Sequence, residues 1–325
     1  MYTKKIDFDP QAHTGLTIYL NDQLVAMNRK KARPFILVLP GGGYSFCSEK
    51  EAEPIALAFV AKGYHAGVLH YHVGAHRNFE HALLDAKRAM TEIKNIDAQF
   101  KVASDKIAVV GFSAGGHLAA AMSTLLEDKP SLCILGYPAI LTSFAEVMKI
   151  EAPSLDTCVT PATPPTFLFS TFEDNVVPIE NSLRYLAALE ENGVPFESHI
   201  FQKGRHGLSL ATQWVSTTPE MIDPRFARWF DLSCEWLTLN WYAAKQELEQ
   251  TQASFPPAPL DIPLISLMKE EKNRRLLLAA FPKFANKSYE KIVRHYTLNQ
   301  LHQIAPEIFL PAKLANVEKR IQKNM

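Results

Sequence analysis

The chain has 325 residues, 47% of them hydrophobic, enough to bury the core of one large α/β domain with a small appendage. Its 34 basic and 34 acidic side chains balance, so neither nucleic acid nor an anionic membrane is favoured as a partner. The start lacks the apolar core of a secretory signal, no apolar run could span a bilayer, and the four cysteines lack C-x-x-C spacing, so we expect a cytoplasmic protein without disulfides.

Short apolar runs along the chain predict strands. Two weak runs, Lys5–Asp9 and Thr17–Leu20, predict an antiparallel start. Six stronger runs follow, at Phe35–Leu39, Ala66–Tyr71, Lys106–Val110, Leu132–Tyr137, Thr166–Ser170 and Phe196–Phe201. Because most of them lack a polar face, we expect strands covered on both sides in a mainly parallel sheet.

Helical patterns lie between these runs. Ser48 and Glu51 have the spacing of a capping box, which predicts a helix that ends at Gly63. Further helices are predicted at Phe79–Asn95, from just after Ser113 towards Glu127, at Pro178–Gly193 and at Arg225–Trp241. Alternating strands and helices predict an α/β fold, with a mainly parallel sheet and helices on both faces.

The composition of the sequence changes after residue 243. Residues 1–243 are predicted to form the α/β domain, and residues 244–261, rich in Gln and Pro, read as a linker. Residues 262–325 hold three or four short helical patterns and no strand pattern, which predicts a small helical module. This module is the candidate surface for a homodimer.

The stretch GFSAGG at 111–116 contains the pattern G-x-S-x-G between a predicted strand and a predicted helix. Such a turn raises Ser113 above the sheet edge at a helix N-terminus, as in a nucleophile elbow. Gly111 and Gly115 permit the tight turn, and Gly116 allows the helix to pack closely on the strand. The alternative is a glycine-rich turn that binds phosphate, but neither dinucleotide-binding nor P-loop spacing is present. The motif alone leaves both open.

A nucleophilic serine needs a base and an acid that orients the base. Asp174 follows the predicted strand at Thr166–Ser170, and His206 follows the next predicted strand. The order Ser, Asp, His, each after a predicted strand of its own, predicts a catalytic triad at the carboxyl edge of the sheet. Glu173 is the local rival of Asp174, and a solvated loop acid and a structural loop histidine are the alternatives. Gly204 and Gly207 flank His206 and are interpreted as leaving room for its ring.

A tetrahedral intermediate also needs hydrogen-bond donors for its oxygen. The run PGGGY directly follows the strand at Phe35–Leu39, and the backbone N–H groups of Gly42 and Gly43 are candidate donors, together with that of Ala114. A plain turn is the alternative. The segment Ala139–Thr163 is rich in proline and is either a short lid or an irregular loop.

Other side chains are weaker candidates. Tyr44, Tyr137 and Trp214 are candidates for a substrate pocket, with a place in the core as the alternative. His117, one turn into the helix, is expected to be structural. Five histidines could suggest a metal, with two of them on one strand face, but no carboxylate or cysteine completes a set, so we expect neither a metal nor a cofactor. They are His65, His70, His72, His76 and His81.

Residues 34–210 resemble the bacterial acetyl esterase/lipase branch of the α/β-hydrolases, akin to xylan and feruloyl esterases. The resemblance is carried by PGGGYSFCSEKEAEPIALAF, GFSAGGHLAAA, DNVVPIENSLRYLAAL and FQKGRHGLSLA. It implies Ser113, Asp174 and His206 as triad, an oxyanion hole from Gly42, Gly43 and Ala114, and hydrolysis of short acyl esters, often acetyl groups on carbohydrates. PGGG stands where many members carry HGGG, which removes a side chain that can brace this loop.

Three functions follow as hypotheses. A serine carboxylesterase acting on small acyl esters is the first, and a peptidase or amidase on the same scaffold is the second. Exopeptidases usually show a charged anchor for a substrate terminus, but Glu49, Glu51 and Glu53 read as a solvated helix start. The third is a binding or scaffolding protein that uses the helical tail. The expected partner is a small-molecule ester, with no nucleic acid and no membrane.

Overall fold

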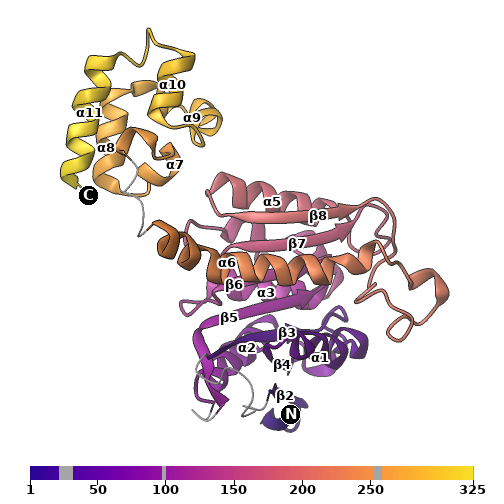
Figure 1. The fold of residues 1–325 in the computed structure, drawn as a ribbon. Coiled ribbons are helices and arrows are strands. Elements are labelled where there is room, and N and C mark those ends of the chain that lie inside the picture. The colour runs from indigo at the N-terminus through magenta and orange to yellow at the C-terminus, as the bar shows by residue number, and fades with distance from the viewer. Residues whose placement is uncertain (22–31, 97–99, 252–257, 325) are drawn as a thin grey trace. The chain divides into compact units, whose positions relative to one another are not determined.

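The computed structural model describes residues 1–21, 32–96, 100–251 and 258–324, and its contacts divide the chain into two units, Met1–Ala243 and Ala244–Met325. The first unit is an eight-stranded sheet in the order β1-β2-β4-β3-β5-β6-β7-β8 (Figure 1). The strands are β1 (Tyr2–Asp9), β2 (Thr14–Leu20), β3 (Arg33–Leu39), β4 (His65–His70), β5 (Val102–Phe112), β6 (Leu132–Gly136), β7 (Thr166–Thr171) and β8 (Phe196–Phe201). β1, β2 and β4 pair antiparallel, and the other neighbours pair parallel, which confirms the predicted mainly parallel sheet.

The helices of the first unit cover both faces of the sheet, as predicted. They are α1 (Glu53–Ala61), α2 (Phe79–Lys94), α3 (Ala114–Leu125), α4 (Thr142–Val147), α5 (Glu180–Glu191) and α6 (Trp229–Thr251). The predicted capping box is wrong, because the Ser48 side chain makes no capping hydrogen bond. Glu49–Glu51 forms a separate 3-10 turn, η1, and α1 begins after it with Pro54 in its first turn, where proline is tolerated.

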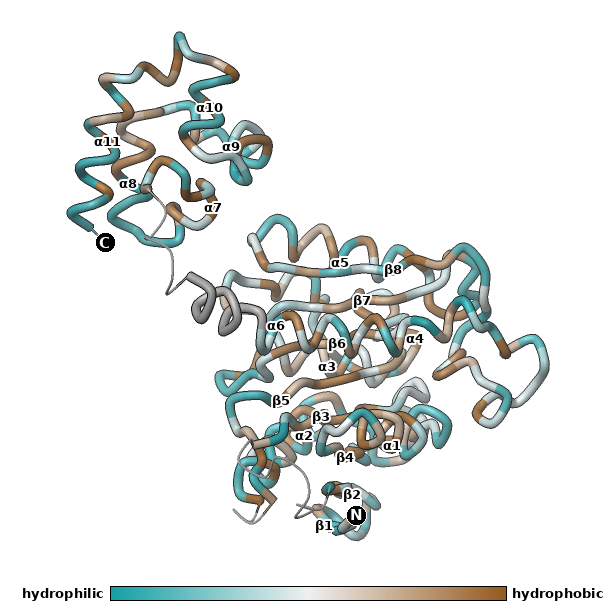
Figure 2. The backbone as a smooth tube through the Cα atoms, viewed as in Figure 1, coloured by the Kyte–Doolittle hydropathy of each residue, from teal (hydrophilic) through white to brown (hydrophobic). Residues whose placement is uncertain are grey.

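Side chains alternate along each central strand between two hydrophobic cores. On β5, Val109 lies in the core under α2, α3 and α5, whereas Ala108 and Val110 lie in the core under α1 and α6. In Figure 2, β5 is brown over the part that lies between the two cores, whereas its first half includes the polar residues 104–106. β8 departs from the prediction of strands buried on both faces, because it is the edge strand and its residues alternate between exposed and half-buried.

The order of the strands creates a crevice at the carboxyl edge of the sheet. β3 and β5 are parallel neighbours, but the chain leaves β3 for α1 on one face and leaves β5 for α3 on the other. Loops that diverge in this way leave an opening above the strand ends, where ligand sites of open α/β sheets form. The loops of PGGGY and GFSAGG both begin at this point.

The segment at 139–163 is part of the packed body of the first unit. It contains α4 and the 3-10 turn η4 (Leu155–Cys158), and apolar side chains from both lie in the core under α3 and α5. The Asn181 side chain accepts hydrogen bonds from the backbone N–H groups of Ile140 and Leu141, at 2.8 and 3.0 Å. These buried contacts favour a fixed loop over a lid.

The first part of the predicted linker 244–261 is helical, since α6 continues to Thr251. The sequence AAKQELEQ consists of good helix formers, which outweigh the change in composition. Residues 252–257 lie outside the described residues, and the 3-10 turn η7 (Pro259–Asp261) follows. Within the described residues, no helix has both the length and the apolar surface needed to cross a bilayer.

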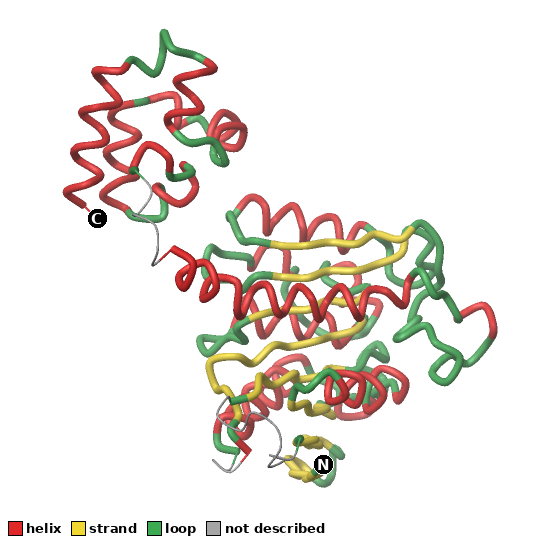
Figure 3. Tube along the Cα trace, in the orientation of Figure 1, coloured by secondary structure: helices red, strands yellow, loops and turns green. Residues whose placement is uncertain are grey.

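The second unit is helical, as predicted (Figure 3). It has its own core around Phe281, Phe284 and Phe309. Five α-helices lie in its described residues, where three or four were predicted. They are α7 (Leu264–Leu267), α8 (Glu271–Ala280), α9 (Lys287–Val293), α10 (Leu298–Ile304) and α11 (Pro311–Asn324), with the 3-10 turn η8 (Pro282–Ala285) after α8. A capping box at Thr297 and Gln300 starts α10.

The close approach of α3 to the end of β3 predicts the effect of Gly115→Ala. A methyl group there would lie 2.1 Å from the carbonyl oxygen of Leu39 and 2.4 Å from that of Pro40, and neither backbone atom can move away cheaply. Although alanine favours helices, we expect the free energy of unfolding of the first unit to fall by about 3 kcal/mol. Urea unfolding followed by tryptophan fluorescence measures it, because all four tryptophans lie within residues 214–241.

Gly193→Ala is the matched control. Gly193 differs from Gly115 in having a positive φ, 66°, but a methyl group there meets no atom within 4 Å. Gly193→Ala should lower the free energy of unfolding by only about 1 kcal/mol, from backbone strain alone. Equal losses in the two variants would show that contact with Leu39 and Pro40 does not constrain α3.

Candidate active site

The turn between β5 and α3 holds Ser113 in a left-handed backbone conformation, with φ 51° and ψ −115°. Such a conformation costs on the order of 1–3 kcal/mol for a residue other than glycine, so the surroundings must impose it. The Ser113 N–H donates to the carbonyl of Gly136 at 3.0 Å, and the Ser113 carbonyl accepts from Ala139 N–H at 3.1 Å. Ser113 thereby stands at the N-terminus of α3, where the helix dipole favours negative charge.

Glycines make this turn sterically possible. A methyl group at Gly111 would lie 2.2 Å from the carbonyl oxygen of Gly115, so β5 and α3 approach as closely as two backbones can. Gly116 has the predicted contact with the strand and a second, closer one. A methyl group there would lie 3.3 Å from the carbonyl oxygen of Gly111 in β5 and 2.9 Å from Pro138 after β6, so this glycine lets α3 pack against both the strand and the next loop of the sheet.

The three side chains of the predicted triad lie within hydrogen-bonding distance of one another. His206 Nε2 is 2.8 Å from Ser113 Oγ, and His206 Nδ1 is 2.7 Å from Asp174 Oδ2. The Asp174 side chain is 3% exposed and that of His206 is 15% exposed, so the chain of hydrogen bonds is largely shielded from water. With the hydroxyl donating to Nε2 and Nδ1–H donating to the carboxylate, the imidazole is held in the tautomer that a general base requires.

Both loops that carry the acid and the base are fixed by local hydrogen bonds. Asp174 Oδ1 accepts from the N–H groups of Val176 and Val177, each at 2.9 Å. The Asn175 side chain accepts from the backbone N–H of His206 at 3.2 Å. Glu173, the rival acid, is exposed, and no hydrogen bond or ion pair of its side chain appears among the described residues.

The interpretation of Gly204 and Gly207 as room for a moving ring is corrected. Gly204 has φ 131° and Gly207 has φ 76°, a backbone that other residues rarely adopt. A methyl group at Gly204 would also lie 2.8 Å from the side chains of Leu208 and Thr171. These glycines therefore shape the loop that presents His206.

The loop after β3 presents free backbone donors beside Ser113. Gly42 and Gly43 have φ 124° and 61°, and a methyl group at Gly42 would lie 2.0 Å from the carbonyl oxygen of Phe46. Within the described parts of the chain, the N–H groups of Gly42, Gly43 and Ala114 donate to no acceptor. Free N–H groups at this edge suit an oxygen that gains negative charge.

Three buried side chains hold this loop in the absence of the histidine of HGGG. The Tyr71 hydroxyl donates to the Pro40 carbonyl at 2.7 Å, and Glu51 Oε2 accepts from Gly41 N–H at 3.0 Å. The Tyr44 hydroxyl is 3.0 Å from His117 Nδ1, which ties the loop to α3.

His117 has the structural role that its position in α3 predicted. It is fully buried, and burial lowers its pKa from 6.5 to about 3, so the ring is neutral. Burial also holds the pKa of the Tyr44 hydroxyl well above its usual value of 10, so this hydroxyl keeps its proton.

The three pocket candidates are corrected. Tyr44 is 0% exposed and Tyr137 is 2% exposed, so both belong to the core and neither lines an open pocket. The Tyr137 ring instead packs edge-on against His206, with centroids 5.0 Å apart. Trp214 is 90% exposed, on the loop between β8 and α6, so its ring has almost no protein contact.

The five histidines of the β4 region do not all gather around one point, although the rings of His72 and His81 lie 5.1 Å apart. His65 is buried between the backbone of Asn21 and that of Phe100, and His70 ends β4. His72 lies beyond the strand and pairs with Asp85 of α2 at 2.6 Å, so the expectation of a shared strand face with His70 is wrong. Among the residues that the structure describes, no three His, Cys, Asp or Glu side chains form a group suited to a metal ion.

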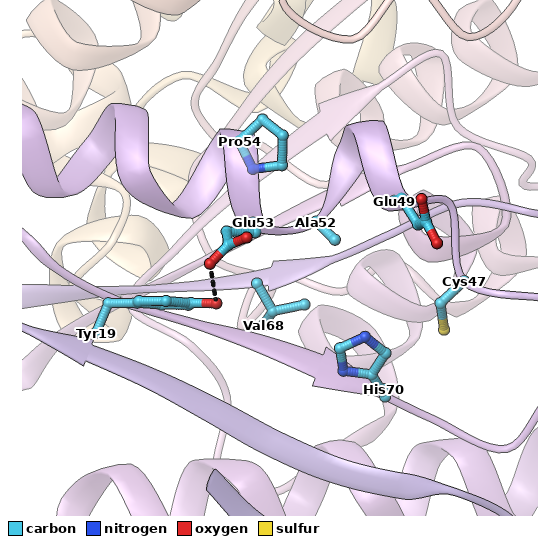
Figure 4. A pocket seen from close by; sticks show the side chains of 8 residues that line it. All are labelled: Tyr19, Cys47, Glu49, Ala52, Glu53, Pro54, Val68 and His70. Atoms are coloured by element: carbon cyan, nitrogen blue, oxygen red, sulfur yellow. Dashed lines mark hydrogen bonds between the residues drawn. The ribbon is translucent and has the colours of Figure 1, made fainter. Parts of the chain in front are cut away.

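A cavity of about 420 Å³ lies over β2 and β4, on the α1 side of the sheet (Figure 4). Its wall is partly polar, and the Tyr19 hydroxyl donates to Glu53 within it at 3.0 Å. The lining residues are Tyr19, Cys47, Glu49, Ala52, Glu53, Pro54, Val68 and His70. None of them belongs to the triad or the donor loop.

Sequence reasoning missed Glu51. Its spacing from Ser48 is that of a capping box, and the neighbouring Glu49 and Glu53 are exposed, as a solvated helix start would be. Glu51 itself is 3% exposed and points inward, where its carboxylate accepts two hydrogen bonds. No local pattern distinguishes it, because its partners Gly41 and Tyr137 come from two other loops.

Two family models match the first unit. The BD-FAE model matches residues 17–133, and the model of the prolyl oligopeptidase family matches residues 143–223. Ser113 lies in the first match, and Asp174 and His206 lie in the second. Each family model therefore covers only part of the candidate triad.

Two curated relatives are similar to part of the chain. Endo-1,4-beta-xylanase B of Butyrivibrio fibrisolvens is 32% identical over 212 residues, and an acetylxylan esterase of Xylanibacter ruminicola is 26% identical over 209 residues. The matches take in 55% and 58% of this chain. The chain spans only 33% and 43% of the length of these relatives.

Solved structures match the first unit more completely. An alpha/beta hydrolase from a Medee basin deep-sea metagenome library is 41% identical, with TM-score 0.69, over 74% of this chain and 98% of that one. The carboxylesterase Cest-2923 of Lactobacillus plantarum WCFS1 is 28% identical, with TM-score 0.68, over 76% and 98%. An acetyl ester-xyloside bifunctional hydrolase of Caldicellulosiruptor lactoaceticus is 35% identical, with TM-score 0.59, over 70% and 89%.

The low pKa of His117 predicts a pH dependence of stability. Between about pH 3 and 6.5 the unfolded chain binds a proton here that the folded protein does not, so the free energy of unfolding falls as the pH falls. His117→Gln removes this contribution. Between pH 5.5 and 4, the stability advantage of wild type over the variant should shrink by about 1.4 kcal/mol per pH unit. Urea unfolding followed by tryptophan fluorescence measures it, and a difference independent of pH would contradict a buried neutral ring.

Proposed function

Because this chain belongs to the α/β-hydrolase family, we propose that it is a serine carboxylesterase that hydrolyses short acyl esters through Ser113, His206 and Asp174. The observation that carries the proposal is the hydrogen-bonded series Ser113–His206–Asp174 on a strained turn, beside free backbone N–H groups. A phosphate-binding turn or a scaffolding protein would need neither the base nor the acid at these distances.

In the proposed reaction, Ser113 Oγ attacks the carbonyl carbon of the ester while His206 Nε2 takes its proton. Asp174 orients the ring and stabilises its positive charge. The carbonyl oxygen becomes an oxyanion, to which Gly42, Gly43 and Ala114 donate their N–H groups. His206 then gives the proton to the departing alcohol, and water hydrolyses the acyl-enzyme by the same route.

Acetyl groups on carbohydrates are the proposed substrates. Support comes from the names of an acetylxylan esterase and an acetyl ester-xyloside hydrolase among the relatives. Since the chain spans less than half of the curated relatives, their activity is carried over as a proposal for this chain. A small ester is the proposed ligand, without nucleic acid or membrane.

A peptidase or amidase is the second candidate function. The match of residues 143–223 to the prolyl oligopeptidase family favours it. However, the charged anchor that an exopeptidase would need is not evident at η1, because Glu51 is already hydrogen-bonded to the protein. We therefore prefer an esterase to a peptidase or amidase.

The proposal extends to the location of the protein and to its self-association. A cytoplasmic site of action is proposed because Cys47, Cys133, Cys158 and Cys234 are all free thiols. A homodimer through the helical unit is proposed because Ile292, Ile304 and Leu310 are more than half exposed there.

Replacing triad residues tests the mechanism. We expect Ser113→Ala to lower kcat for p-nitrophenyl acetate by at least about 10⁴-fold, because among the described residues no other hydroxyl is hydrogen-bonded to His206 Nε2. Asp174→Asn should lower kcat by on the order of 10⁴-fold, because the ring loses its orientation. Glu173→Gln is the matched control and should keep wild-type activity. Full activity of Ser113→Ala would refute the proposal.

A substrate panel tests the proposed class. Rates on acetyl, butyryl and octanoyl p-nitrophenyl esters, acetylated xylo-oligosaccharides and an aminoacyl anilide should be compared as kcat/KM. The acetyl esters should exceed the octanoyl ester and the anilide by at least about 100-fold, since amides need stronger leaving-group protonation. A higher kcat/KM on the anilide would refute the esterase proposal and support the amidase.

A further inference from the structure

We propose that Glu51 is a positioning residue, which fixes the loop of oxyanion donors and the loop of His206 relative to each other through Tyr137. The inference rests on the proposed esterase function and extends it to a residue that contacts no substrate. Glu51 is 3% exposed, and its two carboxylate oxygens accept from different loops. A carboxylate is buried at high cost unless it is hydrogen-bonded, so both bonds have to form in the folded protein.

One oxygen of Glu51 holds the donor loop. Oε2 accepts from the N–H of Gly41 at 3.0 Å, immediately before the donors Gly42 and Gly43. The packing is tight, because a methyl group on Gly41 would lie 2.7 Å from this oxygen and 3.0 Å from Ser113 Cβ. Gly41 thus fits between the carboxylate and the nucleophile. A shift of the carboxylate would move the donors relative to Ser113.

The other carboxylate oxygen of Glu51 holds the loop that carries His206. Oε1 accepts from the Tyr137 hydroxyl at 2.6 Å, and this hydroxyl accepts from the N–H of Ser209, three residues after His206, at 3.0 Å. The Trp229 indole N–H donates to the Ser209 carbonyl at 2.9 Å, which ties this loop to the start of α6. Burial, with the charge of Glu51 in addition, keeps the pKa of Tyr137 well above 10, so the hydroxyl stays protonated and donates to Glu51.

Tyr137 is itself held rigidly in place. It has φ 36°, and its N–H donates to the carbonyl of Phe169 at 2.7 Å. Its ring lies edge-on against His206 at 5.0 Å between centroids. The network therefore runs from the donor loop to the loop that carries His206 without passing through Ser113 or Asp174.

This arrangement predicts that replacing Glu51 slows the chemical step and changes substrate binding little. Glu51 touches neither the proposed nucleophile nor the donors' N–H groups, but it sets where both loops stand. Misplacement of reacting groups by fractions of an ångström lowers the rate of the bond-forming step far more than it lowers ground-state binding.

The test compares Glu51→Gln, Tyr137→Phe and their combination with Glu49→Gln, an exposed neighbour in the same 3-10 turn. The amide keeps the size of the carboxylate but places an NH₂ group opposite the Gly41 N–H or the Tyr137 O–H. We expect Glu51→Gln to lower kcat for p-nitrophenyl acetate at least about 10-fold, with KM within about 3-fold of wild type. Tyr137→Phe should lower kcat by about 3- to 10-fold, and the double variant should match Glu51→Gln, because both act in one network.

The outcomes separate this inference from the proposed function. Wild-type kcat in folded Glu51→Gln and Tyr137→Phe, even with a lower Tm, would mean a purely structural role and overturn the inference. An equal loss in Glu49→Gln, or a loss that appears only in KM, would overturn it as well. If Glu51→Gln does not fold, Tyr137→Phe decides by the same criteria. Activity remaining in Ser113→Ala refutes the esterase mechanism, whereas an inactive Ser113→Ala beside a fully active Glu51→Gln refutes only the role of Glu51.

Discussion

The backbone contact between β5 and α3 is the constraint on which the site depends. A methyl group on Gly111 would lie 2.2 Å from the Gly115 carbonyl oxygen, so β5 and α3 approach closely, and one on Gly115 would lie 2.1 Å from the carbonyl oxygen of Leu39 at the end of β3. This contact, with hydrogen bonds on both sides of Ser113, imposes the left-handed conformation that the serine would not adopt alone. The side chain is thereby directed above the sheet, at the positive end of α3.

The remaining groups reach Ser113 because parallel strands end at one edge of the sheet. The donor loop follows β3, the neighbour of β5, while Asp174 and His206 follow β7 and β8. Since helices leave β3 and β5 on opposite faces, the edge is open where these loops meet. The triad is therefore a consequence of strand order, although 93 residues separate Ser113 from His206.

Polar groups buried beneath this edge give it rigidity. Glu51, Tyr71 and Tyr137 each make hydrogen bonds to loop backbone, so their burial is compensated. His117 is an exception within the described residues, because its Nε2 is buried without a partner while Nδ1 faces Tyr44. A neutral imidazole with a low pKa tolerates this environment, whereas a charged one would not.

The sequence by itself determined the sheet, most helix positions, the three candidate triad residues and the glycine loop. These signals are local: apolar runs, glycines before a helix, and a residue's place after a strand. Only the tertiary structure decided that Glu51 is buried, that Tyr44 belongs to the core and that Trp214 is exposed. The physical reason is that burial and hydrogen bonding of a side chain depend on partners brought from distant loops. Glu49 and Glu51 are the same residue type in the same short turn, and only the loops packed against one of them make the difference.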